Sequence, residues 1–308
     1  MKRLLSLIMV LAFAGFGFAQ ENAGHDTGKT GISNAEMQSR IDKSVNKSIS
    51  ESDIEETKEA IAILQETQEI IGLIAQEKKD EAEKKMAEVL GKLDLLLAKR
   101  PDLALIPVSS TVEMRDVVAD LETVEKIMKA VRQAIDKGYY QEAKHVLNDL
   151  SSEMVIKTAY LPMATYPDAM KLAAKLMDEN KNREAAVVLA QALNTLVIKE
   201  DILPLPVLRA QEYIHQAVMV MNNDKTMKEN KEVLLALLDA ADYELKLAEA
   251  MGYGKKDKEY KELADAIAQL KKYVEKERER KTRKGLNKLE EKLKNFKERL
   301  FPVKQQNK

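Results

Sequence analysis

The sequence predicts an all-α protein, a helical bundle built from duplicated helical hairpins with a C-terminal helical extension. Three observations favour this fold class: apolar residues recur at helical spacing from Ser33 onward, capping boxes begin two of the expected helices, and no stretch reads as a convincing strand. The composition agrees, because 33% of the 308 residues are charged and only 11 are Gly and 7 are Pro.

The first nineteen residues, 1–19, have the pattern of a secretory signal peptide. Lys2 and Arg3 precede an apolar run, and the small residues that follow it suit a signal peptidase, so we expect cleavage after Ala19. The apolar run is shorter than the ~20 residues that span a bilayer, which makes a retained anchor the less favoured alternative. Residues 20–33 are small and polar and are expected to form a flexible leader. The sequence therefore predicts an exported protein of the periplasm.

Two amphipathic helices open the domain that we expect over residues 34–254. Each follows a capping box, Ser33 with Glu36 and Ser52 with Glu55. The apolar positions of these helices are Met37, Ile41, Val45 and Ile49, then Ile54, Ile61, Leu64, Ile71 and Ile74.

Three later segments share one sequence pattern, a Glu-Ala pair followed by a proline nineteen residues after the alanine. Apolar residues also recur four and eleven residues after each alanine, so the same helix face is apolar in each copy. We interpret each copy as a helical hairpin with a proline-marked extended exit. The copies are 61 and 42 residues apart, whereas a solenoid keeps a constant period, so we expect a compact bundle rather than a regular superhelix. The alanines are Ala82, Ala143 and Ala185, the apolar positions are Met86, Leu147 and Leu189, then Leu93, Met154 and Leu196, and the prolines are Pro101, Pro162 and Pro204.

The exits, residues 103–108, 161–163 and 202–207, are apolar where loops are normally polar. Proline prevents a helix from continuing through them. The favoured interpretation is that they lie across the bundle and cover its core. The alternative is that they line a groove or pocket that holds a ligand or another subunit.

Four segments carry a family resemblance: Tyr166-Pro-Asp-Ala-Met-Lys-Leu-Ala-Ala-Lys-Leu-Met-Asp, Arg183-Glu-Ala-Ala-Val-Val-Leu-Ala-Gln-Ala-Leu-Asn-Thr-Leu-Val, Leu203-Pro-Leu-Pro-Val-Leu-Arg-Ala and Ala248-Glu-Ala-Met-Gly-Tyr-Gly. They resemble the YfdX family of exported bacterial proteins. The resemblance covers roughly residues 53–275 and implies an all-helical periplasmic protein that oligomerises, often encoded in acid- or heat-stress loci. It also implies binding of small drug-like molecules without an established enzymatic activity.

The extension, residues 255–308, departs from that family and is predicted to be helical and charged. From residue 275 to 308 it has 13 basic and 6 acidic residues. Such a helix can be solvated with internal ion pairs, pair with an acidic surface of a neighbouring copy, or lie on an anionic membrane. Solvation is the favoured interpretation, self-association the second and membrane contact the least favoured, because the apolar stripe of the extension lacks the Trp of such anchors.

The sequence offers little catalytic chemistry. It has no cysteine, which excludes disulfides, thiolate metal sites and thiol catalysis. No nucleophile elbow, phosphate loop or dinucleotide motif is present, and neither His145 nor His215 has a second ligand at a suitable spacing. We therefore expect no enzyme, no cofactor and no metal site.

Polar residues near the exits are the best candidates for a binding site. Arg209 follows the exit at 202–207, and Tyr160, Tyr166 and Tyr213 lie close to it or to the preceding exit. The favoured interpretation is that buried polar groups bond the irregular exits and fix the register of the bundle. The alternative is that these four residues form the polar part of a ligand site.

The function predicted from the sequence is that of a non-enzymatic, homo-oligomeric periplasmic stress protein. It would protect envelope proteins in a chaperone-like way or sequester amphipathic small molecules through apolar grooves. The alternative is a ligand-binding or sensory module with one defined small-molecule pocket. Nucleic acid is not an expected partner, because acidic and basic residues are nearly equal in number.

Overall fold

The structure is a computed structural model that describes residues 33–50, 55–101, 104–117, 119–223, 225–254 and 257–302. The predicted signal peptide and the leader up to residue 32 lie outside the described residues. In chain order the elements are α2 (Asn34–Ser50), α3 (Glu55–Ala75), α4 (Lys79–Lys99), β1 (Leu105–Arg115), α5 (Leu121–Asp136), α6 (Tyr140–Asp149), β2 (Glu153–Pro162), α7 (Tyr166–Asp178), α8 (Asn182–Leu193), β3 (Val197–Pro204), α9 (Leu205–Met221), α10 (Met227–Met251), α11 (Lys258–Glu275) and α12 (Glu279–Leu300).

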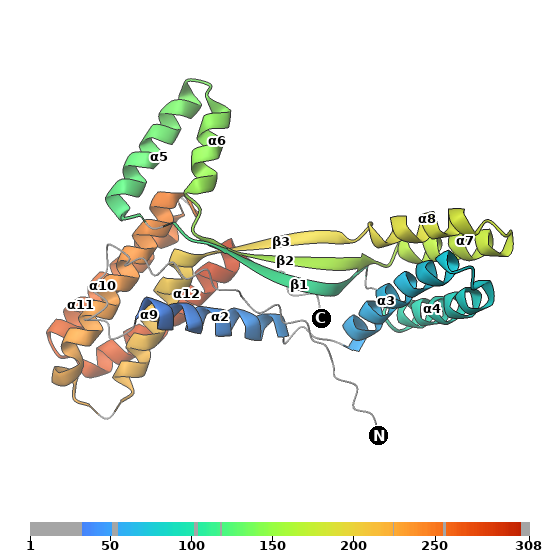
Figure 1. The fold of residues 1–308 in the computed structure, drawn as a ribbon. Helices are drawn as coiled ribbons and strands as arrows, with labels where there is room; N and C mark the ends of the chain where they lie inside the picture. Colours follow the sequence, from blue (N-terminus) through green and yellow to red (C-terminus); the bar gives the residue numbers. More distant parts are fainter. Residues whose placement is uncertain are drawn as a thin grey trace.

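A long antiparallel sheet joins two groups of helices (Figure 1). Its strand order is β1-β2-β3, and a helical hairpin connects each strand to the next. Helices α3, α4, α7 and α8 form the N-terminal bundle at one end of the sheet, and α2, α9, α10, α11 and α12 form the C-terminal bundle at the other. The expectation of one compact bundle was therefore wrong, because the sheet separates two cores.

The expectation of an all-α fold was wrong at the apolar exits, which form or end the three strands. Pro162 and Pro204 end β2 and β3 rather than helices, a position that the missing N–H of proline allows. The central strand β2 is buried along most of its length, so its sequence EMVIKTAYLP lacks the polar alternation of a strand with one exposed face. A short apolar run of this kind cannot be assigned from periodicity alone.

Among the described residues, four helical hairpins share one turn. A residue with positive φ follows the first helix of each hairpin, and the next residue donates its N–H to a carbonyl five residues back. This is the Schellman arrangement, which satisfies the last carbonyls of the helix. The positive-φ residues are Glu77, Gly138, Asn180 and Glu277, in the hairpins α3–α4, α5–α6, α7–α8 and α11–α12.

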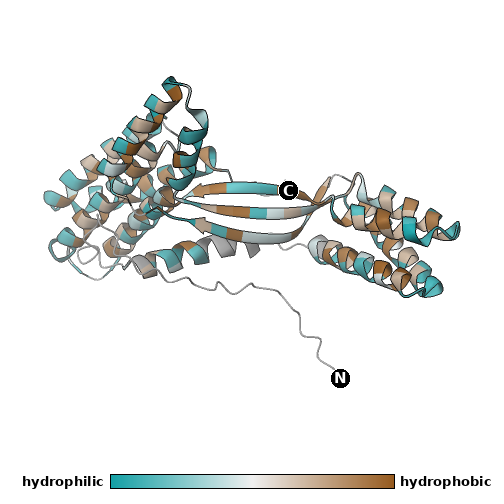
Figure 2. Ribbon diagram, turned by 45° about the horizontal axis from the view of Figure 1, so that its top comes forward, coloured by the Kyte–Doolittle hydropathy of each residue, from teal (hydrophilic) through white to brown (hydrophobic). Residues whose placement is uncertain are grey.

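Counting from this turn residue aligns the four hairpins and extends the predicted threefold repeat to the C-terminal extension. The position five residues after the turn is buried in all four copies, at Ala82, Ala143, Ala185 and Thr282. One ion pair recurs as well, since Lys99 binds Glu59 and Arg299 binds Glu259 at the corresponding positions. Along the helices, hydrophobic and hydrophilic residues alternate as amphipathic packing requires (Figure 2).

The hairpin α11–α12 packs against α9 and α10 as part of the C-terminal bundle. The apolar stripe predicted on the extension is buried there, and the ring of Phe296 meets that of Tyr260 edge-on at 4.9 Å between centroids. Within the part of the chain that the structure describes, no helix has the length and apolar character to cross a membrane.

Candidate functional site

The four residues of the predicted ligand site fall into two places. Arg209 and Tyr213 lie one turn apart on α9, in the C-terminal bundle. Tyr160 and Tyr166 lie at the far end of β2 and at the start of α7, beside the N-terminal bundle. The structure therefore brings together two of these residues and separates them from the other pair.

The two distant tyrosines each have a local structural partner. The hydroxyl of Tyr166 donates to Oγ1 of Thr67 at 2.9 Å, and burial raises the pKa of Tyr166 to about 12. The ammonium of Lys199 lies 4.9 Å from the ring centroid of Tyr160, a cation–π contact. These contacts tie β2 and α7 to neighbouring elements.

Arg209 is the centre of a partly buried charged cluster where the sheet meets the C-terminal bundle. Its guanidinium binds the carboxylate of Asp116, which follows β1, and Oγ of Ser152 donates to the same carboxylate at 2.6 Å. Burial disfavours the charge of Arg209, but the carboxylates of Glu244 and Asp116 outweigh burial and raise its pKa. Arg209 thus ties α9 to the segment that follows β1, and the hydroxyl of Ser152 ties that segment to the start of β2.

Glu244 is the least satisfied member of the cluster. It lies on α10 with its side chain buried, and among the described residues its Oε2 has no hydrogen-bond partner. Burial raises the pKa of Glu244 from 4.5 to about 7, with Arg209 opposing the shift and Asp116 adding to it. The cluster therefore holds a carboxyl group that exchanges its proton near neutral pH.

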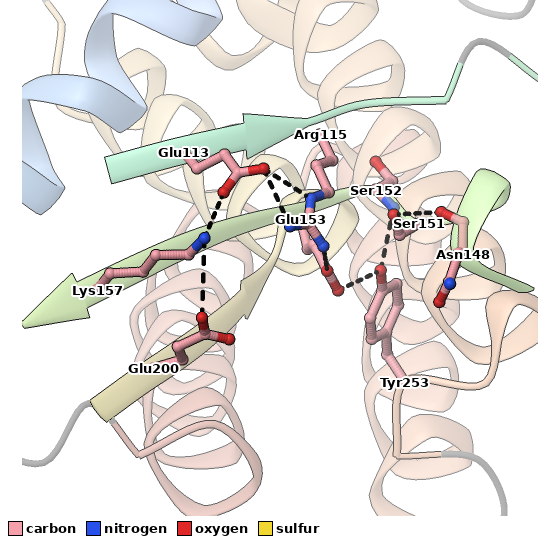
Figure 3. A network of polar contacts seen from close by, with 9 residues as sticks. All are labelled: Glu113, Arg115, Asn148, Ser151, Ser152, Glu153, Lys157, Glu200 and Tyr253. Carbon is pink, nitrogen blue, oxygen red and sulfur yellow. Dashed lines mark hydrogen bonds and ion pairs between the residues drawn. The ribbon is translucent and has the colours of Figure 1, made fainter. Parts of the chain in front are cut away.

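A polar network continues from the cluster across the sheet (Figure 3). The hydroxyl of Tyr253, in the segment after α10, accepts the N–H of Ser152 at 3.0 Å and donates to Glu153 at 3.2 Å. Glu153 pairs with Arg115 on β1 at 3.5 Å. On the same face, Lys157 joins Glu113 at 2.8 Å to Glu200 at 3.7 Å and so ties all three strands together, as Figure 3 shows.

The titration of Glu244 predicts a pH-dependent stability. The folded protein holds this proton more tightly than the unfolded chain, so stability falls as the pH rises from 4.5 to about 7. The full effect is about 3 kcal/mol at 1.36 kcal/mol per pH unit. Urea unfolding of Glu244→Gln and of the unchanged protein from pH 4.5 to 8 should show that the glutamine variant lacks this part of the loss.

Glu232, an exposed glutamate on the same helix, provides the matched control. The Glu232→Gln variant should keep the pH-dependent loss of stability that Glu244 causes in the unchanged protein. A loss of the same size in Glu244→Gln would contradict the assignment of a buried, neutral-range carboxyl to position 244.

The sequence prediction included Arg209 and Tyr213 but missed Asp116, Glu244 and Tyr253. One signal for Glu244 was present, because it takes an apolar position three residues after Ala241 on the buried stripe of α10. The ion pair between Arg209 and Asp116 could not be predicted, because the position of Asp116 depends on the pairing of strands that the sequence does not predict. Within the described residues, no group of three or more His, Cys, Asp or Glu side chains has the arrangement of a metal site.

The outer strand β3 is a second candidate surface. Among the described residues it pairs with β2 on one side only, so its other edge presents backbone donors and acceptors. Two large apolar side chains on it are strongly exposed, Ile198 at 57% and Ile202 at 44%. Lys199, Glu200 and Asp201 lie between them. An apolar strand edge of this kind can accept an extended segment of another polypeptide.

One family model matches the chain. Residues 63–202, from within α3 through nearly all of β3, match the family described as YfdX protein. The solved structures that match include the YfdX of Salmonella Typhi, at 15% identity and a TM-score of 0.32, covering 48% of this chain and 91% of that chain. No curated protein matches the chain. The family match thus covers residues 63–202, the part of the chain that runs from α3 through the three strands to β3.

Proposed function

We propose that this protein is an exported, non-enzymatic, stress-related protein of the periplasm that binds non-native envelope proteins. In this proposal an extended segment of a client adds to the edge of β3. The observation that carries the proposal is the strand edge with exposed Ile198 and Ile202. The predicted signal peptide and the YfdX family match over residues 63–202 support the periplasmic, stress-related part of the proposal.

The chemistry of β3 suits reversible binding of many clients. Backbone hydrogen bonds at a strand edge do not depend on the client's sequence, and the two isoleucines favour segments with apolar side chains. The three charged residues between them oppose permanent edge-to-edge pairing, as charged side chains do on other natural strand edges. Two side-chain contacts hold β3 on β2. Lys157 of β2 pairs with Glu200 of β3, and Lys199 of β3 lies over the ring of Tyr160 of β2.

An aggregation assay with reduced, unfolded lysozyme tests the proposal. We expect the unchanged protein at several-fold excess to suppress light scattering, and the double variant Ile198→Lys, Ile202→Lys to lose most of this effect, because lysine on a strand edge blocks pairing. Leu172→Lys, Val187→Lys is the matched control, since it makes the same change at exposed positions on α7 and α8. No suppression by the unchanged protein, or equal loss in both variants, would refute binding at β3.

Sequestration of amphipathic small molecules is the second form of the proposal. Exposed apolar side chains on the N-terminal bundle favour it, among them Leu95, Leu172 and Val187. In that form the control variant Leu172→Lys, Val187→Lys would lose binding of an amphiphile, whereas the β3 variant would keep it.

The charged cluster supports a second candidate function, a ligand-binding or sensory module. The observation in its favour is the unpartnered Oε2 of Glu244 among the described residues, which a ligand with an amine or hydroxyl donor would satisfy. Calorimetry with an amphipathic amine would show saturable one-to-one binding that Glu244→Gln removes. Weak binding that is unchanged in Glu244→Gln would argue against this candidate.

A further inference from the structure

The two faces of the outer strand β3 carry different side chains. Successive side chains of a strand point to opposite faces of the sheet, and β3 pairs with β2 in one continuous register along its length. Ile198, Glu200 and Ile202 therefore lie on one face. Lys199 and Asp201 lie on the other face, where their opposite charges offset each other. The first face thus presents an acidic side chain between two exposed isoleucines at alternate positions of the strand.

The charge of Glu200 is only partly offset by its neighbours on this face (Figure 3). Nζ of Lys157 lies 2.8 Å from a carboxylate oxygen of Glu113 but 3.7 Å from one of Glu200, whose side chain is 53% exposed. Among the described residues, this face of the sheet has three carboxylates and two cations: Glu113, Glu153 and Glu200 against Arg115 and Lys157. One negative charge is therefore left over, and Glu200 is the carboxylate on the strand with the open edge.

We propose that the edge of β3 selects client segments in which a basic residue lies between two apolar residues at alternate positions. This selection rests on the proposed function, since the segment binds as a strand added to β3. Such a strand places one side chain beside Glu200 and its alternate neighbours beside Ile198 and Ile202, where a cation and two apolar side chains fit. The pattern reads the same in both directions, so it suits a parallel or an antiparallel strand. The intervening side chains meet the other face, where the charges of β3 cancel and select no residue type.

The same charges disfavour a second copy of β3 as the occupant of this edge. In antiparallel pairing about a two-fold axis, the residue on the axis lies opposite its own counterpart in the other copy. An axis at the middle of β3, at Lys199, Glu200 or Asp201, places two like charges opposite each other. Like charges in this position destabilise a strand pair. A client with a basic residue gains attraction where a second copy meets repulsion, so charge assigns the edge to a client.

Fluorescence anisotropy with three labelled peptides tests the selection on the full chain. The first contains Val-Thr-Lys-Thr-Val, in which the lysine and both valines share one face of a strand. The second contains Val-Thr-Glu-Thr-Val, which reverses the central charge. The third contains Thr-Val-Lys-Val-Thr, which keeps the charge but puts the valines on the other face. We expect the first peptide to bind about five- to tenfold more tightly than either of the others.

Substitutions at Glu200 test whether this residue makes the selection. Glu200→Gln should bind the lysine and glutamate peptides equally, and Glu200→Lys should prefer the glutamate peptide, a reversal that partial unfolding cannot produce. Asp201→Asn is the matched control, since it makes the same kind of change on the other face of β3, and it should keep the preference for lysine.

Two outcomes would overturn the selection, and they differ in what they mean for client binding. If the unchanged protein binds all three peptides equally and Ile198→Lys, Ile202→Lys abolishes this binding, the selection is refuted while client binding at β3 stands. If the unchanged protein binds none of the peptides, both the selection and the strand-edge binding are refuted.

Discussion

Phe296→Ala is expected to lower the free energy of unfolding by about 3–5 kcal/mol, as large-to-small changes of buried aromatic residues do. The ring is fully buried in the C-terminal bundle, where it contacts Tyr260 edge-on. Its loss leaves a cavity between α11, α12 and α9 that the surrounding helices fill only in part. Urea unfolding followed by circular dichroism measures the change.

Lys294→Ala on the exposed face of α12 is the control for this prediction, and its effect should stay within about 0.5 kcal/mol. The comparison decides whether the basic C-terminal segment is a structural part of the bundle. Equal and small effects of both substitutions would mean that α12 does not pack on the bundle in solution.

Arg209→Ala is expected to destabilise the protein by about 3 kcal/mol at pH 7, since removal of one partner leaves buried charges uncompensated. The guanidinium neutralises Asp116 and lowers the pKa of the buried Glu244. Without it the pKa of Glu244 rises further, so the loss of stability should be larger at pH 8 than at pH 5. Chemical unfolding at the two pH values measures both effects.

Arg132→Ala, at an exposed arginine of α5, is the matched control and should have little effect at either pH. The dependence on pH separates the charged cluster from a loss of packing, which would be the same at pH 5 and pH 8. A pH-independent loss in Arg209→Ala would contradict the coupling between Arg209 and Glu244.

The helices could be predicted because their apolar spacing and turn residues are local features. The fourth hairpin was not predicted as a copy of the repeat, because it has Lys281-Thr282 at the position where the other copies have Glu-Ala. The positive φ of Glu277 and the buried positions counted from it show that this hairpin has the same structure as the other three. The repeat is therefore present in the structure of the fourth hairpin, although its sequence lacks the Glu-Ala pair.

The strands could not be predicted because β2 is buried on both faces and its residues carry no alternation. The missed strands also explain why the four residues of the predicted site fall into two places. Glu153 begins β2 beside the cluster of Arg209, and Tyr160 lies seven residues further along the strand. Because a strand rises about 3.3 Å per residue, Tyr160 is roughly 20 Å away from that end rather than two helical turns away. Arg209 and Tyr213 were correctly placed together because they are four residues apart on one helix.

Hydrogen–deuterium exchange of β3 in the presence of an unfolded client tests the proposed function most directly. Only one edge of β3 is paired in the described structure, so the amides of the other edge should exchange quickly in the protein alone. We predict that reduced lysozyme slows exchange within residues 197–204 and leaves α7 and α8 unchanged. Binding of the client with unchanged exchange in β3 would contradict the account.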